Sequence, residues 1–207
     1  MKHAFQLLIP CLALCLLLAA CGGESQSSGE VSQQQTTQSQ TETGTDTSTA
    51  ADSGAGVLSS FSTQTLAGET VDNTMLSGYP VTMVNVWATF CSPCIQEMPD
   101  LGTLAAEYAD KGVQIVGLVS DVLSSDATID QEQVDLAKEI VASTGASYPH
   151  LLPSAELIQS VLLSTQVVPT TFFVDETGNQ IGETITGARS MDQWRSILDA
   201  MLAEHGG

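Results

Sequence analysis

The segment from Val81 to Pro99 constrains this chain more than any other part of its sequence. It opens with an apolar, β-branched run, Val81 to Trp87, which predicts a buried strand. Cys91 and Cys94 follow in a C-x-x-C arrangement, and the residues after them are compatible with a helix. A strand that leads directly into a helix places Cys91 at the helix N-terminus, where free backbone N–H groups and the helix dipole favour the thiolate. The segment therefore predicts a reactive thiol pair suited to disulfide exchange.

The first 20 residues predict a signal peptide. Lys2 and His3 precede an uncharged, leucine-rich run that is short for a membrane span and is interrupted by Pro10. The run ends in Leu-Ala-Ala-Cys, which resembles the lipobox of bacterial lipoproteins, where the signal peptide is removed before the cysteine and the cysteine carries lipid. We therefore expect a lipid on Cys21. An ordinary secretory peptide and an uncleaved anchor are the alternatives.

The stretch that follows Cys21 predicts a disordered tether. From Gly22 to about Gly56 it consists mainly of Ser, Thr, Gln, Gly and Glu, with Val31 as its single large aliphatic side chain. Such a composition buries too little apolar surface to offset the entropy of ordering the chain. We therefore expect a signal peptide at 1–20, a lipidated cysteine and tether at 21–56, and a folded domain at 57–207.

The cysteine count narrows the role of the C-x-x-C pair. Cys11 and Cys15 lie in the signal peptide and Cys21 is expected to carry lipid, which leaves Cys91 and Cys94 in the domain. An exported domain with one C-x-x-C has no disulfide framework to build, so the pair is either redox-active or half of a metal site. No second C-x-x-C or Cys/His pair completes a zinc set, and we expect neither a metal nor a cofactor.

The charge balance limits the possible partners. The chain has 5 Lys and Arg against 24 Asp and Glu, a formal net charge of −19. Such a chain does not attract nucleic acid or anionic lipid electrostatically, so a link to the membrane has to come from the lipid. Basic partners are favoured.

Strand and helix patterns alternate along the domain. The helix after Cys91 carries an apolar stripe at helical spacing, formed by Met98, Leu101, Leu104, Ala105 and Tyr108. Strands are expected at 61–66, 69–71, 113–119, 148–152, 167–174 and 180–185, and helices at 129–144, 154–163 and 190–204. Ile129 and Leu136 are among the candidate apolar positions of the first of these helices, and Trp194 belongs to the apolar stripe of the last, which is expected to face the core. This alternation predicts an α/β domain whose sheet is covered on both faces.

Several motifs together resemble the thioredoxin superfamily, and within it the membrane-tethered TlpA/ResA-like branch. They are the run from Trp87 to Cys94 (WATFCSPC), Glu97, Pro99, the tripeptide Val168-Pro169-Thr170 and the turn at 175–178. The resemblance covers roughly residues 60–202. It implies a thioredoxin-like fold, with a central mixed sheet flanked by helices, an N-terminal β extension and a helical insertion.

The resemblance also implies roles for individual residues. Cys91 attacks a partner disulfide, and Cys94 resolves the mixed disulfide, which leaves a Cys91–Cys94 disulfide. Pro169 matches a position that is cis in the family and lies beside the thiols, where it holds a substrate strand. The residues expected to bind substrate are Trp87, Pro93, Val168 and Pro169.

A proton acceptor for Cys94 is expected after the cysteines rather than before them. Thioredoxins proper place an Asp six residues before the first cysteine, where this chain has Asn85, which does not titrate. The TlpA/ResA-like branch has a Glu three residues after the second cysteine, and Glu97 matches it. We therefore expect Glu97 to act as the acid/base. A carboxylate that merely favours the helix N-terminus is the alternative.

Other residues near the motif depart from the family. Phe90 replaces a common Trp, and Ile95 and Gln96 stand where the family commonly has a basic residue. With no cation nearby in the sequence, Cys91 relies on the helix dipole, which weakly favours a reductase; Lys111 or an arginine remains a candidate for reaching the site in space. His150, beside a proline turn, is expected to be structural.

The leading functional hypothesis is an extracytoplasmic disulfide reductase, which is expected to be a monomer. Family members reduce apocytochrome c, and similar lipoproteins pass electrons from a CcdA/DsbD-type membrane donor to methionine sulfoxide reductases. A disulfide-forming oxidase or isomerase and a non-enzymatic binding module are the alternatives. Ala88 lies where a peroxiredoxin needs Thr, and the C-x-x-C spacing differs from the C-x-x-x-C of copper chaperones.

Overall fold

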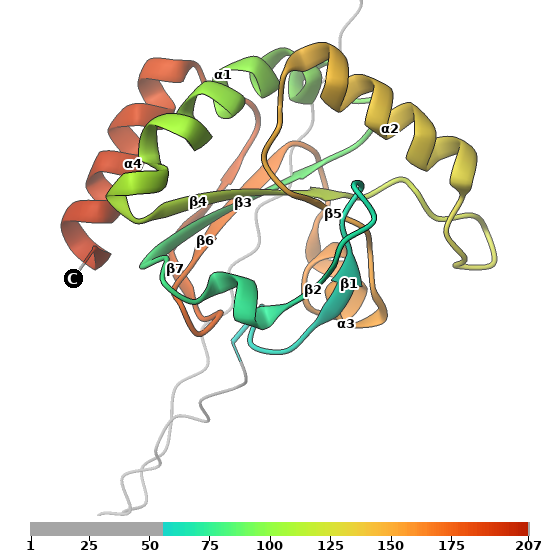
Figure 1. The fold of residues 1–207 in the computed structure, drawn as a ribbon, viewed down its shortest axis with the longest axis horizontal. Helices are drawn as coiled ribbons and strands as arrows, with labels where there is room; N and C mark the ends of the chain where they lie inside the picture. Colours follow the sequence, from blue (N-terminus) through green and yellow to red (C-terminus); the bar gives the residue numbers. More distant parts are fainter. Residues whose placement is uncertain (1–55, 207) are drawn as a thin grey trace, which may run out of the picture. The chain divides into compact units, whose positions relative to one another are not determined.

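The computed structural model describes residues 56–206, and these residues form an α/β fold (Figure 1). The expected signal peptide, the expected lipid site at Cys21 and most of the expected tether lie outside the described residues. In chain order the elements are β1 (Ser62–Gln64), β2 (Thr70–Asp72), η1 (Asn73–Leu76), β3 (Val81–Trp87), α1 (Ser92–Tyr108), η2 (Ala109–Lys111), β4 (Val113–Val119), α2 (Gln131–Thr144), β5 (His150–Leu151), α3 (Ala155–Ser160), η3 (Leu162–Ser164), β6 (Thr170–Val174), β7 (Gln180–Thr186) and α4 (Met191–His205).

A five-stranded mixed sheet in the order β5-β4-β3-β6-β7 organises the domain. β3 pairs in parallel with β4 and antiparallel with β6, so the strand that leads to the cysteines lies at the centre. All seven residues of β3 are buried, as expected for a strand covered on both faces. The predicted mixed sheet flanked by helices is confirmed.

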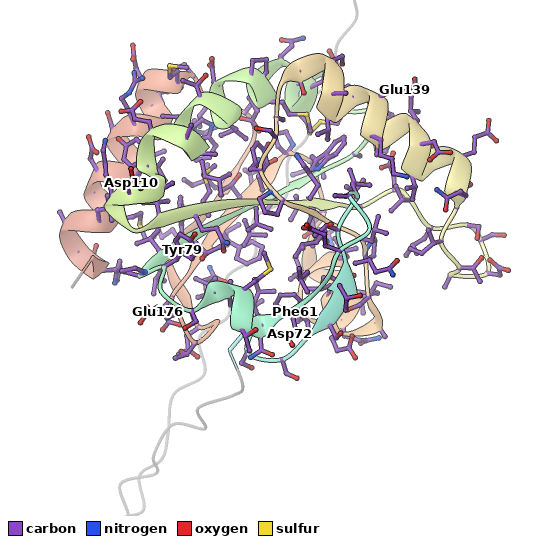
Figure 2. All side chains as sticks on the ribbon, viewed as in Figure 1. Phe61, Asp72, Tyr79, Asp110, Glu139 and Glu176 are labelled. Atoms are coloured by element: carbon purple, nitrogen blue, oxygen red, sulfur yellow. A yellow bond between two sulfur atoms is a disulfide. The ribbon has the colours of Figure 1, made fainter. Side chains whose placement is uncertain are left out.

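The two faces of the sheet bury separate clusters of side chains (Figure 2). Helices α1, α2 and α4 cover one face, whereas α3, η1 and the β1–β2 hairpin cover the other (Figure 1). The side chains of successive β3 residues alternate between the two clusters, because side chains along a strand point to opposite faces of the sheet. Met83 and Trp87 pack under the helices with Cys91 and Cys94, and Val84 packs on the opposite face. The thiol pair therefore belongs to the core beneath α1.

The predicted N-terminal β extension is the two-stranded β1–β2 hairpin, and the helical insertion is α2, between β4 and β5. The hairpin joins the edge of the main sheet through backbone bonds from Leu66 N to His150 O and from Leu152 N to Gln64 O. These bonds hold the short strand β5 between the hairpin and β4.

Some sequence predictions were wrong in detail. Ile129 and Leu136, expected among the inward-facing residues of the insertion, are 41% and 42% exposed, and α2 buries only Val134 and Ala137. The helix expected at 154–163 is two pieces, α3 and η3, joined at Val161, whose φ of −123° is not helical. The segment expected as a strand at 148–152 forms ladder pairs only at His150–Leu151.

Each of the two main helices beside the site has a clear beginning. Ser190 caps α4 in a capping box with Gln193, at the start of the helix expected at 190–204. Pro93 lies in the first turn of α1, where a missing N–H is tolerated.

Within residues 56–206, no helix has both the length and the apolar character needed to cross a membrane.

Candidate redox site

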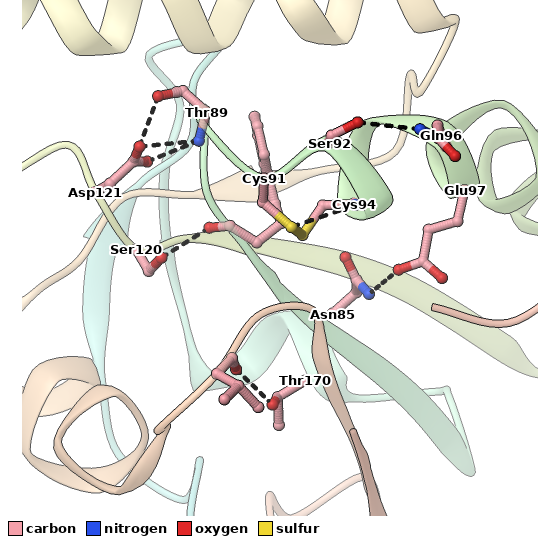
Figure 3. Close-up of a disulfide and its surroundings, with 12 residues drawn as sticks. Asn85, Thr89, Cys91, Ser92, Cys94, Gln96, Glu97, Ser120, Asp121 and Thr170 are labelled. Atoms are coloured by element: carbon pink, nitrogen blue, oxygen red, sulfur yellow. Dashed lines mark hydrogen bonds between the residues drawn. A yellow bond between two sulfur atoms is a disulfide. The ribbon is translucent and has the colours of Figure 1, made fainter. Parts of the chain in front are cut away.

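The loop between β3 and α1 is anchored by the end of β4. Both carboxylate oxygens of Asp121 accept the Thr89 backbone N–H, at 3.0 and 2.9 Å, and Oδ2 also accepts from the Thr89 hydroxyl at 2.6 Å. The Ser120 hydroxyl donates to the Trp87 carbonyl at 2.9 Å (Figure 3). The loop that carries Cys91 is therefore fixed on the side facing β4.

Cys91 is the N-cap residue of α1, as the sequence predicts. Its φ and ψ of −85° and 94° are non-helical, and its Sγ accepts the backbone N–H of Cys94 at 3.3 Å. This position exposes the sulfur to the positive end of the helix dipole and to an otherwise free N–H group, both of which stabilise a thiolate. The first turn of α1 holds no acidic residue.

Cys91 and Cys94 form a disulfide, the pairing that the family resemblance implies (Figure 3). Cys91 is 5% exposed and Cys94 is 0% exposed. Phe90, directly before Cys91, is 77% exposed, and Pro93 between the cysteines is also exposed. The disulfide therefore lies just under the surface, with an exposed aromatic ring beside it.

Glu97 lies one helical turn after Cys94 on the same side of α1, is 3% exposed and is held by three N–H donors. Asn85 Nδ2 donates to Oε1 at 3.1 Å, while the Arg189 backbone N–H and Trp194 Nε1 donate to Oε2 at 3.1 and 3.2 Å. Burial raises the pKa of Glu97, and the three hydrogen bonds oppose this by favouring the charged form. Glu97 is thus a buried carboxyl one helical turn from Cys94, and its proton affinity is set by burial against three hydrogen bonds.

The sequence did not predict any of the three donors to Glu97. Trp194 was expected only as a core residue of the last helix; it is fully buried, yet its indole N–H faces the carboxylate. Arg189 contributes a backbone group from the loop between β7 and α4. The apolar stripe of the last helix indicated burial of Trp194, but no sequence signal could have shown which carboxylate its N–H meets.

Asn85 occupies the centre of β3 and faces α1. Besides its bond to Glu97, its Nδ2 group donates to Thr171 Oγ1 at 3.0 Å from the neighbouring strand β6. The amide oxygen of Asn85 is buried and has no hydrogen-bond partner among the described residues. Asn85 therefore connects Glu97 to β6 through its nitrogen alone.

The segment before β6 approaches the cysteine loop. The peptide bond between Val168 and Pro169 is cis, as the resemblance implies. Val167 and Val168 line a surface cavity of about 270 Å³ together with Phe90. Pro169 is buried, whereas Val167 is exposed and Val168 is half-buried. Two segments far apart in the sequence thus form one shallow surface next to the disulfide.

Trp87 and His150 form a buried pair beneath the site. Trp87, expected at the substrate surface, is 0% exposed, and its Nε1 donates to His150 Nδ1 at 3.1 Å. His150 Nε2 lies 2.9 Å from the Ala146 carbonyl, so a neutral ring protonated on Nε2 satisfies both bonds. Burial lowers the pKa of His150 to about 4. His150 therefore has the structural role that the sequence analysis favoured.

Few positive charges lie near the cysteines among residues 56–206. Lys111 does not reach the site: it lies 4.0 Å from the Tyr108 ring centre and pairs with Glu107 at the other end of α1. Arg189 is the cation beside Glu97, and its guanidinium donates to the carbonyls of Gly187 and Ala188 rather than to a carboxylate. The described residues also contain no group of three or more His, Cys, Asp or Glu that could hold a metal ion.

Comparison with known proteins assigns this arrangement to a family. A family model described as Redoxin matches residues 47–202, which is most of the chain. The chain belongs to the Redoxin family. The cysteine pair and its surroundings described above all lie within the matched part of this Redoxin.

Curated relatives of this Redoxin include thiol–disulfide oxidoreductases called ResA. The protein from Bacillus thuringiensis (strain Al Hakam) is 29% identical over 140 residues, which cover 67% of this chain and 73% of the relative. The protein from Oceanobacillus iheyensis is 32% identical over 119 residues, which cover 56% of this chain and 55% of the relative.

A solved thiol:disulfide interchange protein of the thioredoxin family from Chlorobium tepidum TLS superposes with a TM-score of 0.57 at 29% identity, covering 69% of this chain and 93% of the other. The fold, the relatives and the paired cysteines agree. This Redoxin is a thiol–disulfide oxidoreductase, and Cys91 and Cys94 form its cysteine pair.

Proposed function

We propose that the chain reduces disulfides in exported client proteins while a lipid on Cys21 tethers it to the outer surface of a bacterial cell membrane. The observation that carries the reductive direction is Glu97, a buried carboxyl one helical turn from Cys94 with no cationic side chain paired to it among the described residues. A strong oxidant needs a stabilised reduced form, usually through a stabilised thiolate. A buried carboxylate beside the pair works against thiolates and therefore favours a reductant.

The reaction transfers two electrons from the cysteine pair to the client. The Cys91 thiolate attacks one sulfur of the client disulfide, and the other client sulfur leaves and takes up a proton. Cys94 loses its proton to Glu97 and attacks Cys91 Sγ, which closes the Cys91–Cys94 disulfide and releases the second client sulfur as a thiolate that takes up a proton from Glu97 or from solvent. Burial keeps the pKa of Glu97 raised, which brings this carboxyl closer to the working pH as a proton acceptor.

The client is expected to dock where the cysteine loop meets the segment before β6. Phe90 and Val167 are exposed apolar residues that line this surface together with Val168, and Pro93 is exposed between the two cysteines. An extended client segment that passes over this surface brings its disulfide to Cys91, the more exposed residue of the pair. The net charge of −19 favours clients with basic surroundings.

The reduction potential tests the direction of electron flow. We expect the full chain, equilibrated with dithiothreitol or glutathione buffers, to have a potential near that of thioredoxin, about −270 mV. A value near that of DsbA, about −120 mV, contradicts the proposal and favours a disulfide-forming oxidase. Insulin reduction by the wild type and by Cys91→Ser provides the activity control. Equal rates exclude catalysis through the pair and favour a binding module.

Two cell experiments test the tether and the clients. Cys21→Ala should release the chain from the membrane fraction of a bacterial host, and retention of the variant there contradicts a lipid anchor.

Cys94→Ser leaves Cys91 without its resolving partner and should trap clients as mixed disulfides. We expect apocytochrome c or a methionine sulfoxide reductase among them, and a CcdA/DsbD-type donor for the reducing electrons. Recovery of no mixed disulfide from oxidised extracytoplasmic proteins contradicts the proposed reaction.

A further inference from the structure

The amide oxygen of Asn85 is a buried acceptor that lacks a donor among the described residues. Asn85 itself is 1% exposed, and both bonds that its side chain makes use the nitrogen, toward Glu97 and Thr171. Buried polar groups are almost always paired, so an unpaired one in a well-packed core calls for a physical explanation. A donor for this oxygen has to reach it while the nitrogen keeps both of its hydrogen bonds.

The position of this oxygen points to the cysteines. Alternation along β3 places Asn85 on the same face as Met83 and Trp87, which pack in one cluster with Cys94. Figure 3 shows the amide of Asn85 below the disulfide, with its nitrogen toward Glu97 and its oxygen turned up toward the sulfurs. Cys94 is 0% exposed, so no solvent competes for its sulfur.

The redox state of the pair explains the missing donor. The structure holds the disulfide, in which neither sulfur carries a hydrogen. Reduction adds two electrons and two protons, breaks the S–S bond and creates two S–H groups. The S–H group of Cys94 forms inside the core, where it needs an acceptor.

We propose that the amide oxygen of Asn85 accepts a hydrogen bond from the Cys94 thiol in the reduced enzyme. Asn85 then contacts the resolving cysteine through its oxygen and the acid/base Glu97 through its nitrogen, so one side chain connects the proton donor with the proton acceptor. The oxygen is unpaired in the oxidised state and paired in the reduced state, which favours reduction of the pair. The inference rests on the dithiol–disulfide chemistry of Cys91 and Cys94 and is independent of the client and of the direction of electron flow.

Infrared spectroscopy of the S–H stretch tests the contact directly, since a hydrogen bond to an oxygen lowers the frequency of this band. The sample is the full chain with Cys11, Cys15 and Cys21 changed to Ser, so that reduced-minus-oxidised spectra report only the catalytic pair. We expect a lowered band in the folded wild type compared with the same reduced chain in urea. Asn85→Leu should move the band up, Asn85→Asp should keep it low because an acceptor remains, and Thr171→Val should leave it unchanged.

The reduction potential provides a second readout. Asn85→Leu should lower the equilibrium constant for reduction by dithiothreitol three- to tenfold, which corresponds to a potential about 15–30 mV more negative for this two-electron couple. Thr171→Val, which removes one partner of the Asn85 nitrogen and leaves its oxygen, should change the constant less than twofold. The same Asn85→Leu effect should persist in a Glu97→Gln background, because the oxygen acts on Cys94 directly.

Three results overturn the inference. They are an S–H band at the same frequency in folded wild type and in urea, a band that Asn85→Leu does not move, and a potential shift that disappears in the Glu97→Gln background. The first comparison needs no Asn85 variant, so it decides the matter even if Asn85→Leu does not fold. None of these results depends on insulin reduction or on the absolute potential, which test the proposed function separately.

Discussion

The indole N–H of Trp194 in α4 donates to Oε2 of Glu97 in α1 at 3.2 Å, across a sequence separation of 97 residues. With the Asn85 amide and the Arg189 backbone N–H it gives Glu97, among residues 56–206, three donors and no acceptor. An ionised carboxylate, which only accepts hydrogen bonds, matches this set better than a carboxylic acid or an amide does. Burial favours the neutral acid, so the proton affinity of Glu97 reflects a balance between its surroundings and its donors.

Trp194→Phe should raise the pKa of Glu97 further. The substitution keeps most of the buried ring and removes one hydrogen bond that favours the charged form. We expect the Glu97 carboxyl to titrate at higher pH when followed by carbon-13 NMR, with a loss of about 1 kcal/mol in the free energy of unfolding. Trp87→Phe is the matched control, because it removes the indole N–H that His150 accepts and leaves the donors of Glu97 intact. Identical titration of Glu97 in wild type and Trp194→Phe contradicts this account.

Glu97→Gln should change how stability depends on pH. The folded-state pKa of Glu97 is raised, so the native state holds the proton over a pH range in which the unfolded chain has lost it. This contribution to stability is present below about pH 4.5 and is lost as the pH rises through the folded-state pKa. Wild type should therefore lose stability relative to Glu97→Gln in urea titrations of the oxidised chain as the pH rises.

Glu107→Gln is the control for that measurement, with the opposite sign. Hydrogen bonds from Arg195 lower the pKa of Glu107, so this carboxyl contributes stability above the unfolded pKa. Wild type should gain stability relative to Glu107→Gln as the pH rises toward about 4.5, below the range in which it loses stability relative to Glu97→Gln. A pH-independent difference between wild type and Glu97→Gln shows that Glu97 keeps an ordinary pKa.

Wild type should lose stability at acidic pH because of His150, and His150→Gln should abolish this loss. Burial lowers the pKa of His150 to about 4, so on acidification the unfolded chain takes up this proton first. Stability is retained above about pH 6.5 and decreases as the pH falls toward 4, by roughly 3 kcal/mol in total. Glutamine does not titrate and retains an acceptor for Trp87. Urea titrations at pH 7 and pH 4.5 check this, and equal pH dependence in wild type and variant contradicts it.

Gly117→Ala should destabilise the fold through a clash with His150. A Cβ at this position of β4 would collide with the imidazole ring. Relief requires movement of a ring whose two nitrogens are both hydrogen-bonded, so we expect a loss of about 1–3 kcal/mol. In a His150→Ala background the ring is absent, and Gly117→Ala should then have little effect on the free energy of unfolding. An equal effect in both backgrounds contradicts the clash.

Local patterns in the sequence predicted much of the fold and the centre of the site. The β-branched run before Cys91 became the central strand, and Cys91 caps the helix that the following residues predicted. Apolar spacing in the last helix correctly indicated burial of Trp194. These features depend on the spacing of apolar residues along one helix or one strand. Such local spacing can be read from a single sequence.

The remaining features depend on how separate elements pack. The insertion helix has an apolar pattern that is compatible with more than one orientation, so the exposure of Ile129 and Leu136 was not apparent. The donors of Glu97 from Arg189 and Trp194 come from the other end of the domain. Their contact with α1 depends on the placement of α4 over the sheet, which no motif encodes. The unpaired oxygen of Asn85 likewise depends on the orientation of one amide.

Because Cys91 and Cys94 lie inside the core beneath α1, folding and oxidation are thermodynamically linked. The oxidised and reduced chains, each folded or unfolded, form a closed cycle of four states. The free energies of unfolding of the oxidised and the reduced chain therefore differ by a fixed amount. This amount is the free energy that corresponds to the difference in reduction potential between the folded and the unfolded pair. Any substitution in the core that favours one redox form also shifts the potential, even far from the sulfurs. Chemical denaturation of both forms thus measures, without any redox buffer, how far the fold moves the potential from that of the unfolded pair.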